Sequence, residues 1–415
     1  MSKASIIGAY NTEFGAFVTK DKATGLMTDT KTYYDLLIEA GRGAIKDSGV
    51  DAKDIDAIYV GSCSPASFNN QEHVAPIAAE IDPALRFKPM TRTECACASS
   101  TVGLYAGINA IESGRAKNVL VIGVEKMNLL PTPQMTQVLA CSSYWPTEGS
   151  QGWSFPMLFA AYAKGYQAQY KIPNEEFEKM LWTIAALGYK NGAENPLAQQ
   201  RKGPQTMEEI AALTVADEKG KCKNMMIAAP LRLHDCSLVS DGAAALVITA
   251  TANVGSRKAR AVEIAGIGHS CERLPINVRS NMYELMAGKD AAAKAYAEAG
   301  IKASDVNFAE VHDCFTINEI LSVEALGFSA DGRAGHDFLA GRFTRDDDKV
   351  AINLSGGLKA KGHPVGATGA SMHALAYKQI VGEAVGVKAK KADIGIAFNV
   401  GGSAVTNCVT ILRKL

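Results

Sequence analysis

The chain has 415 residues, of which 47% are hydrophobic and 21% charged, so it can bury a large core and is not a disordered segment. Its 43 basic residues balance 43 acidic ones, and this zero formal charge disfavours a general binder of nucleic acid or anionic membranes. No apolar run approaches the ~18 residues of a membrane span, and the first residues lack the features of a signal peptide. We therefore expect a cytoplasmic protein without a membrane-spanning helix. Its nine cysteines form no C-x-x-C pair, so we expect them to be reduced.

The first predicted element is a strand over residues 4–9, and the segment after it is repeated later in the chain. An amphipathic helix that ends at Gly49, a short polar turn and a buried strand recur around Gly300. At one constant offset Asp54 matches Asp305, and Cys63 matches Cys314. An ungapped match of this kind indicates an internal duplication.

Each copy continues with a second helix and strand. The first copy predicts a helix over residues 97–113 and a strand over 118–124, and the second predicts a helix over 367–383 and a strand over 393–398. Strands that are apolar at nearly every position are typical of a parallel sheet covered on both faces. The sequence therefore predicts an α/β fold of two βαβ-type halves with alternating layers of helix and sheet.

A long segment of different composition separates the two copies. Residues 128–232 hold all three tryptophans and many prolines, and we interpret them as an inserted loop domain that shapes a substrate pocket. A strand over residues 240–250 then returns to the first core, and a hinge follows. The predicted domains are an N-terminal core half (1–127 plus 233–253), the insertion (128–232) and a C-terminal core half (254–415).

The first candidate site residue is Cys97, which precedes a helix rich in small residues. A cysteine in the first turn of a helix faces unpaired backbone N–H groups and the positive end of the helix dipole, and both stabilise a thiolate. Such a thiol is a nucleophile only where a base lies nearby, and otherwise an inert buried cysteine is the simpler interpretation. Cys95, two residues upstream, is the rival nucleophile.

His363 is the second candidate, in a segment with five glycines over residues 353–369. A histidine in so glycine-rich a loop is poorly explained as core filler, and a catalytic role is favoured. The rival interpretation, a phosphate-binding loop, lacks both the G-x-x-x-x-G-K-[ST] and the G-x-G-x-x-G pattern.

Two further segments follow predicted strands. His312 and Cys314 come directly after a buried strand, near the carboxyl end where α/β sheets usually bind ligands. Asn399 to Ser403 contains Gly401 and Gly402, whose N–H groups either donate to an oxyanion or merely close a tight turn.

A metal site is the competing interpretation of these residues. Nitrogen and sulfur ligands are available from five side chains, namely Cys95, Cys97, His312, Cys314 and His363. Their spacing matches no zinc module, so we expect no metal.

Four motifs, in this order and together, resemble the thiolase superfamily: Cys-Ala-Ser-Ser at Cys97, Ser-Asp-Gly-Ala-Ala-Ala at Ser240, His-Asp-Cys-Phe at His312 and Gly-His-Pro at His363. The chain is similar, over essentially its whole length, to sterol-carrier-protein-type thiolases and related bacterial and archaeal thiolases. The resemblance implies a five-layered αβαβα thiolase fold with an inserted loop domain. It also implies CoA thioester substrates, coenzyme A as co-substrate, no other cofactor and no metal.

The resemblance carries expectations about assembly. The family implies a homodimer or a dimer of dimers, and some relatives work with a separate small OB-fold, zinc-ribbon subunit, so such a partner is a further expectation here. Because the chain ends after the last predicted strand, we expect no appended sterol-carrier domain.

This sequence departs from the pattern of ordinary thiolases at two positions. Those enzymes carry a second catalytic cysteine where Asn399 stands and an Asn motif where His312 stands. An asparagine cannot shuttle protons, and in the sterol-carrier type the cysteine of His-Asp-Cys-Phe takes that duty. The resemblance therefore assigns the acid/base role to Cys314.

By the same resemblance, Cys97 attacks the 3-oxo carbon of the substrate and becomes acylated, with His363 as its base. His312 and His363 hold the thioester oxygen of the departing enolate, and Cys314 protonates it. Backbone N–H groups at Cys97 and near Gly402 bind the tetrahedral oxyanion.

The expected activity is cleavage of a 3-oxoacyl-CoA by CoA, or the reverse Claisen condensation. The aromatic residues of the insertion mostly pack the loop domain or dimer contacts, and a minority view is that some line a pocket for a bulky or aromatic acyl group, as in benzoylsuccinyl-CoA. Three alternatives stay open: a decarboxylating, ketosynthase-like condensing enzyme, a retro-aldol enzyme and a non-catalytic CoA-ester-binding subunit.

Overall fold

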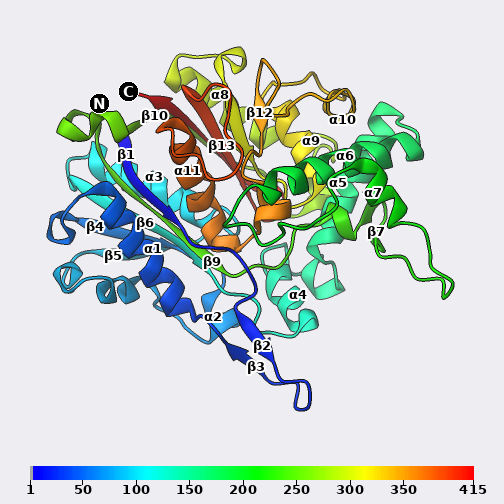
Figure 1. Ribbon diagram of the computed structural model, residues 1–415, viewed down its shortest axis with the longest axis horizontal. Helices are drawn as coiled ribbons and strands as arrows, with labels where there is room; N and C mark the ends of the chain where they lie inside the picture. The colour runs from blue at the N-terminus through cyan, green and yellow to red at the C-terminus, as the bar shows by residue number, and fades with distance from the viewer. Residues whose placement is uncertain (1–2) are drawn as a thin grey trace.

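The computed structural model describes residues 3–415, and a ten-stranded mixed sheet runs through the centre of the molecule (Figure 1). The strand order is β12-β11-β13-β14-β10-β1-β9-β6-β4-β5. The N-terminal half of this sheet contains β1 (Ala4–Asn11), β4 (Ala57–Gly61), β5 (Met90–Thr93), β6 (Asn118–Glu125) and β9 (Gly242–Ala250). The C-terminal half contains β10 (Val262–Cys271), β11 (Phe308–Val311), β12 (Ala351–Ile352), β13 (Ile394–Gly401) and β14 (Thr406–Lys414).

The two halves of the sheet repeat one topology. The order β1-β9-β6-β4-β5 corresponds strand for strand to β10-β14-β13-β11-β12, and the halves meet where β1 pairs with β10. The helices before β4 and β11, α1 (Tyr33–Ser48) and α8 (Met286–Ala299), both end at a glycine in the left-handed region, Gly49 at φ 64° and Gly300 at φ 66°. The predicted duplication is confirmed.

The prediction of a parallel sheet is wrong in part. Strands β4, β5 and β6 are parallel, as are β11, β12 and β13, but β1, β9, β10 and β14 pair antiparallel with their neighbours. An unbroken apolar pattern reports that both faces of a strand are covered by helices, and it carries no information about strand direction. Antiparallel β9 is buried along its whole length for the same reason as its parallel neighbours.

Helices complete the five layers that the resemblance implies. Helix α1 packs on the outer face of the N-terminal half, against β1, β6 and β9, and α8 packs on β10 and β14 of the other half. Helices α3 (Ser99–Glu112) and α11 (Thr368–Ile380) contact each other between the halves, where α3 packs on β4 and β6 and α11 packs on β9 and β13. The layers therefore alternate αβαβα.

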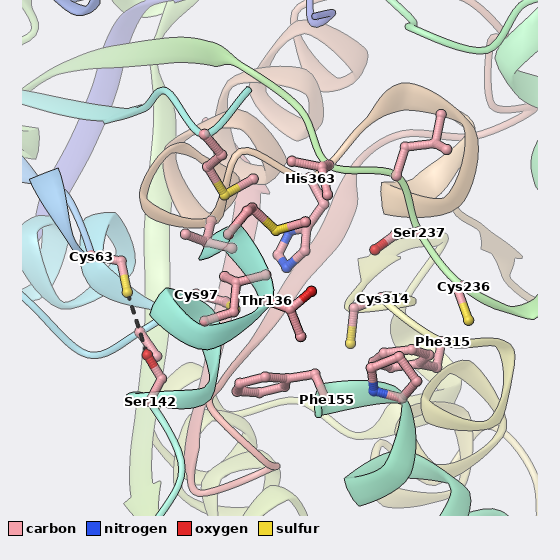
Figure 2. A pocket seen from close by; sticks show the side chains of 18 of the residues that line it. Cys63, Cys97, Thr136, Ser142, Phe155, Cys236, Ser237, Cys314, Phe315 and His363 are labelled. Atoms are coloured by element: carbon pink, nitrogen blue, oxygen red, sulfur yellow. Dashed lines mark hydrogen bonds between the residues drawn. The ribbon is translucent and has the colours of Figure 1, made fainter. Parts of the chain in front are cut away.

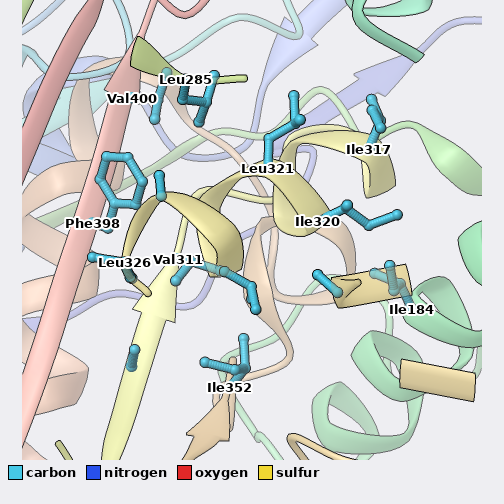
Figure 3. Packing of buried hydrophobic residues seen from close by; sticks show 14 of the residues in the cluster. Ile184, Leu285, Val311, Ile317, Ile320, Leu321, Leu326, Ile352, Phe398 and Val400 are labelled. Carbon is cyan, nitrogen blue, oxygen red and sulfur yellow. The ribbon is translucent and has the colours of Figure 1, made fainter. Parts of the chain in front are cut away.

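The insertion packs on the C-terminal half. Its helices are α4 (Thr132–Ala140), α5 (Phe155–Tyr170), α6 (Asn174–Ala193) and α7 (Met207–Ala212), followed by the short strands β7 (Met226–Ala228) and β8 (Leu231–Arg232). Buried side chains of α5 and α6 belong to the same hydrophobic cluster as those of α9 (Thr316–Ala325) and β11. Figure 3 shows Ile184 of α6 beside Ile320 of α9. The insertion thus shares a core with the half that carries His312.

Among residues 3–415, no helix has both the length and the apolar character needed to span a membrane.

Candidate active site

A cavity of about 170 Å³ lies between the central helices and the insertion (Figure 2). It is lined by Cys97, Cys314, His363 and Gly402, together with apolar side chains such as Met135 and Phe155. Within the described part of the chain, no Lys, Arg, Asp or Glu lines the cavity. The cavity therefore combines reactive side chains with a wall that carries no fixed charge.

Cys97 reaches this cavity from a turn in front of α3. The predicted helix start at Cys97 is wrong by two residues: Ala98 N–H donates to the Cys95 carbonyl at 3.0 Å, Ser99 N–H donates to the Ala96 carbonyl at 3.2 Å, and α3 begins at Ser99. Ala96 has a φ of 50°, and this left-handed residue reverses the chain and turns Cys97 inward.

The expected lowering of the Cys97 pKa is also wrong for this structure. Burial raises the pKa of the Cys97 thiol to about 12, although the backbone N–H groups of Gly402 and of Cys97 itself act to lower it. Desolvation outweighs these donors because the thiolate has no counter-charge in the cavity. Cys97 is therefore a neutral thiol at rest, and it needs a base to become a nucleophile.

Cys95 lies on the other side of the same turn. Its neighbours are Cys271 and Thr406, and it does not line the cavity. The structure thus separates the two rival cysteines.

His363 is held from both sides of its loop. Its backbone N–H donates to Ser240 Oγ at 2.8 Å, and its Nδ1 lies 2.7 Å from Thr368 Oγ1. The Thr368 hydroxyl donates its one proton to the Pro364 carbonyl, so it accepts from Nδ1–H. This network leaves Nε2 of His363 with a free lone pair, which is the tautomer that a general base needs.

His312 has the opposite tautomer. The amide group Nδ2 of Asn399 lies 3.1 Å from Nδ1 of His312, and Asn399 Oδ1 accepts from Thr101 Oγ1 at 2.7 Å. An amide nitrogen only donates, so Nδ1 of His312 accepts and Nε2 carries the proton. Asn399 lies within β13 rather than in the glycine turn, so it orients His312 and is not part of that turn.

These residues from three distant segments converge. The sulfur of Cys97 and one ring nitrogen each of His312 and His363 all lie within 4.8 Å of one another. The two imidazole rings are 5.0 Å apart between centroids and nearly perpendicular at 86°. Burial lowers the pKa of His363 to about 3 and that of His312 well below its usual value, so both rings are neutral near pH 7.

Cys314 faces the same cavity from the segment after β11. Figure 2 shows its sulfur between Phe315 and the space in front of Cys97. Burial raises its pKa well above the usual value for a thiol, and the neighbouring Cys97 and Asp313 raise it further. Cys314 is therefore a protonated thiol at neutral pH.

Gly402 forms the remaining wall, in the turn between β13 and β14. Its φ of 62° lies in the left-handed region, where glycine carries no steric penalty, and its N–H is directed at the Cys97 sulfur. The structure shows the tight turn that the sequence predicts, and the role of its N–H group as an oxyanion donor stays a prediction.

Sequence reasoning missed Glu125, the last residue of β6. This fully buried carboxylate accepts from Cys63 N–H at 2.6 Å and from Gly366 N–H at 3.0 Å, and so ties the loop after β4 to the loop that carries His363. Burial raises its pKa to about 7. A glutamate that ends an otherwise apolar strand was the available signal.

The residues fit a metal poorly. Cys97, His312 and His363 lie close enough to hold an ion. However, Asn399 fixes the proton of His312 on Nε2 and occupies Nδ1, so neither nitrogen of this ring offers a free lone pair. A tetrahedral N/S site would require that network to break.

The family follows from comparison with known proteins. Residues 4–252 match the family described as thiolase, N-terminal domain, and residues 268–414 match the family described as thiolase C-terminal domain-like. The chain belongs to the thiolase family. Thiolases use coenzyme A as co-substrate without an additional cofactor.

Curated relatives cover all or nine tenths of the chain. The acetyl-CoA acetyltransferase of Methanothermobacter thermautotrophicus is 35% identical over 414 residues, which cover 100% of each chain. Sterol carrier protein 2 of Homo sapiens is 29% identical over 91% of this chain and 67% of its own length.

Two solved structures share the fold. An Ltp2-ChsH2(DUF35) aldolase matches 100% of this chain and 98% of its own with a TM-score of 0.80 and 21% identity. A monomeric SCP2-thiolase like protein type 1 from Mycobacterium smegmatis matches 100% of this chain and 78% of its own with a TM-score of 0.70 and 16% identity.

Proposed function

We propose that this thiolase-type acyltransferase cleaves a 3-oxoacyl-CoA with CoA, or runs the reverse Claisen condensation, through an acyl-enzyme on Cys97. The observation that carries the proposal is the convergence of the Cys97 sulfur with nitrogens of His312 and His363 within 4.8 Å, beside a cavity that Cys314 also lines. A nucleophile, a base, a neutral donor and an acid are the four groups that this reaction requires.

The first half-reaction forms the acyl-enzyme. Nε2 of His363 takes the proton of the Cys97 thiol, and the thiolate attacks the 3-oxo carbon. The N–H groups of Gly402 and Cys97 hold the resulting oxyanion. The bond between C2 and C3 then breaks and leaves the acyl group on Cys97 and an acyl-CoA enolate.

The enolate requires stabilisation and a proton. Nε2–H of His312 and the newly protonated His363 donate to its thioester oxygen, and the Cys314 thiol protonates its C2 carbon. In the second half-reaction the thiol of incoming CoA returns a proton to the Cys314 thiolate, and its sulfur attacks the acyl group on Cys97. The departing Cys97 thiolate takes back its proton from His363, and the cycle closes.

The cavity indicates the character of the transferred acyl group. Its wall is apolar, with aromatic side chains at Phe155 and Phe315 and methionine side chains at Met127 and Met135. Burying a carboxylate in such a wall without a cation is costly. We therefore propose an uncharged acyl group of up to aryl size. Benzoylsuccinyl-CoA fits this rule, because its benzoyl part would be carried on Cys97 and its carboxylate would stay with the CoA product.

Turnover assays test this function. A panel of short, long and aromatic 3-oxoacyl-CoAs with free CoA is expected to yield acyl-CoA products with the wild type and none with Cys97→Ala. Equal turnover by Cys97→Ala would overturn the nucleophile assignment, and no turnover of any panel member would overturn the thiolytic function.

The same assay addresses the rival functions. A ketosynthase-like enzyme would condense malonyl thioesters with decarboxylation and ignore acetyl thioesters. The presence of Cys314 disfavours a decarboxylating mechanism, because decarboxylation generates the carbanion without a proton shuttle. A non-catalytic carrier would bind CoA esters and leave them intact in the presence of free CoA.

We also propose a homodimer or dimer of dimers. Strand β5 ends the sheet with β4 as its neighbour on one side, and its residues are half-exposed or exposed. A small OB-fold, zinc-ribbon partner is proposed on the basis of the two-component name of the Ltp2-ChsH2(DUF35) aldolase. Light scattering of the purified chain measures the oligomeric state. Light scattering of the chain co-expressed with genes adjacent to its own measures the binding of a partner subunit.

A cytoplasmic location stays a prediction.

A further inference from the structure

We propose that Arg279 is a positioning residue that holds the Gly402 turn in the geometry needed to bind the oxyanion. The inference rests on the proposed function, in which the Gly402 N–H is one of the oxyanion donors. Arg279 does not line the cavity and would act through the turn. It belongs to the segment between β10 and α8, which has no part in the mechanism above.

All three guanidinium nitrogens of Arg279 are used. Nη1 donates to the Ser403 carbonyl at 2.5 Å, and Nη2 donates to Ser403 Oγ at 3.1 Å. Nη2 also donates to the Leu274 carbonyl at 3.0 Å, and Nε donates to the Arg273 carbonyl at 2.9 Å. Two of these contacts hold the residue next to Gly402, and the other two fix the guanidinium to its own segment.

The turn depends on outside support because its backbone is unusual. Gly402 has a φ of 62° and Ala404 a φ of 61°, so two left-handed residues flank Ser403. A non-glycine residue such as Ala404 is strained in this region, and it keeps this conformation where neighbouring groups hold the backbone in place. Arg279 on Ser403, and Glu272 N–H on the Val405 carbonyl at 2.8 Å, provide such groups.

Arg279 also joins the turn to the insertion. Nη1 donates to Tyr162 Oη at 2.6 Å, and Tyr162 lies on α5, the helix whose first residue, Phe155, lines the cavity. Nearby, the fully enclosed Glu148 of the insertion accepts from Ile276 N–H at 2.7 Å. One planar guanidinium thus fixes the oxyanion donor relative to the acyl wall.

A lysine cannot replace these contacts. The guanidinium presents five N–H donors in a rigid plane, whereas an ammonium is a single point with three donors on a flexible stem. Arg279→Lys keeps the positive charge and removes the rigid plane of five N–H donors. The Gly402 N–H then points less well at the oxyanion, and losing one such donor typically costs about 10²–10³ in kcat.

The experiment compares Arg279→Lys with Arg257→Lys in the full chain. Arg257 is a matched control, because it is half-buried and its guanidinium donates to two backbone carbonyls, of Ser48 and Gly49, far from the cavity. We expect Arg279→Lys to lower kcat by about tenfold or more, a part of the full donor loss, with KM within threefold. We expect Arg257→Lys to keep kcat within twofold of the wild type.

Two further measurements separate positioning from general destabilisation. Alkylation of Cys97 by iodoacetamide builds no oxyanion and depends on the Gly402 N–H only through its contact with the thiolate, so in Arg279→Lys the alkylation rate is expected to fall by much less than kcat. Amide hydrogen exchange of residues 399–406 is expected to accelerate in that variant. An unchanged kcat, or a loss of kcat matched by an equal loss of alkylation rate, would overturn the inference.

Failure of the proposed function is distinguishable from failure of this inference. A wild type that turns over no 3-oxoacyl-CoA refutes the function, whereas amide exchange still reports on the turn. Unaltered exchange in Arg279→Lys would then overturn the role of Arg279 independently.

Discussion

Two neutral imidazoles take opposite roles at this site because of one partner each. The Thr368 hydroxyl donates a hydrogen bond to the Pro364 carbonyl and accepts one from Nδ1–H of His363, so Nε2 of His363 is an acceptor. The amide of Asn399 donates to Nδ1 of His312, so Nε2 of His312 is a donor. Neither role requires a charge on the resting enzyme. The arrangement suits a site in which burial disfavours every ionised form.

Alkylation of Cys97 is expected to depend steeply on pH. Because the pKa of the thiol is raised to about 12, the rate of iodoacetamide alkylation of the free enzyme is expected to rise about tenfold per pH unit from pH 7 to 10, without a plateau. A plateau below pH 8 would show a pre-formed thiolate. Cys97→Ala gives the background from the other cysteines.

The pH profile of catalysis follows from His363. Its folded pKa is lowered to about 3, so the imidazole stays neutral and able to act as a base well below the usual histidine value of about 6.5. The kcat/KM profile is therefore expected to show no loss of activity centred near pH 6.5. An acid limb at that pH that disappears when His363 is replaced would contradict the assignment.

At the scale of elements, the site is held together by loops from both halves of the duplication. The loop after β4 and the loop that carries His363 meet at Glu125. Helix α11 begins directly after the second of these loops. A side chain on Gly366 would collide with Glu125 Oε2, at 2.6 Å, which shows how closely these loops approach. The glycines of this segment allow that approach.

Glu125→Gln tests the junction. The N–H groups of Cys63 and Gly366 both donate to Oε2, so the glutamine oxygen takes that place and its N–H₂ group replaces Oε1, against the Ser64 N–H. A buried donor left without its acceptor costs about 1–3 kcal/mol. We expect a lower Tm and a lower kcat. The control, Glu80→Gln at an exposed glutamate, is expected to match the wild type in thermal denaturation. Equal Tm values for the two variants would contradict the role of Glu125.

The sequence predicted the helices and strands better than the direction in which the strands pair and the burial of the site. The motifs at Cys97, His312 and His363 could be grouped from their resemblance to one family, and the glycines at 49 and 300 located the duplication. Strand direction was not accessible, since β9 is apolar whether parallel or antiparallel. The raised pKa of Cys97 was not accessible from the local sequence, because burial, a property of the whole fold, outweighs the local N–H donors.

At the scale of the whole molecule, the two halves bury apolar surface against each other, and we expect them to unfold as one unit. One hydrophobic cluster contains Ile108 of α3 and Tyr377 of α11, and β1 pairs with β10 across the join. The insertion shares a second cluster with the C-terminal half. Each half therefore buries its inner helix against the other.

This packing predicts that the halves do not fold alone. Residues 254–415, expressed as a fragment, would expose the apolar faces of α11 and β10 that the other half covers. We expect the fragment to lack a cooperative thermal transition by circular dichroism, whereas the full chain shows a single one. A fragment with a sharp transition of its own would contradict the shared core.

Mass spectrometry of the trapped acyl-enzyme tests the central claim most directly. After brief incubation with an apolar 3-oxoacyl-CoA in the absence of free CoA, the peptide that contains Cys97 is expected to gain the mass of the acyl group. The adduct is expected to persist in Cys95→Ala and to vanish in Cys97→Ala. An acyl group found on Cys95, on Cys314 or on no residue at all would contradict the account.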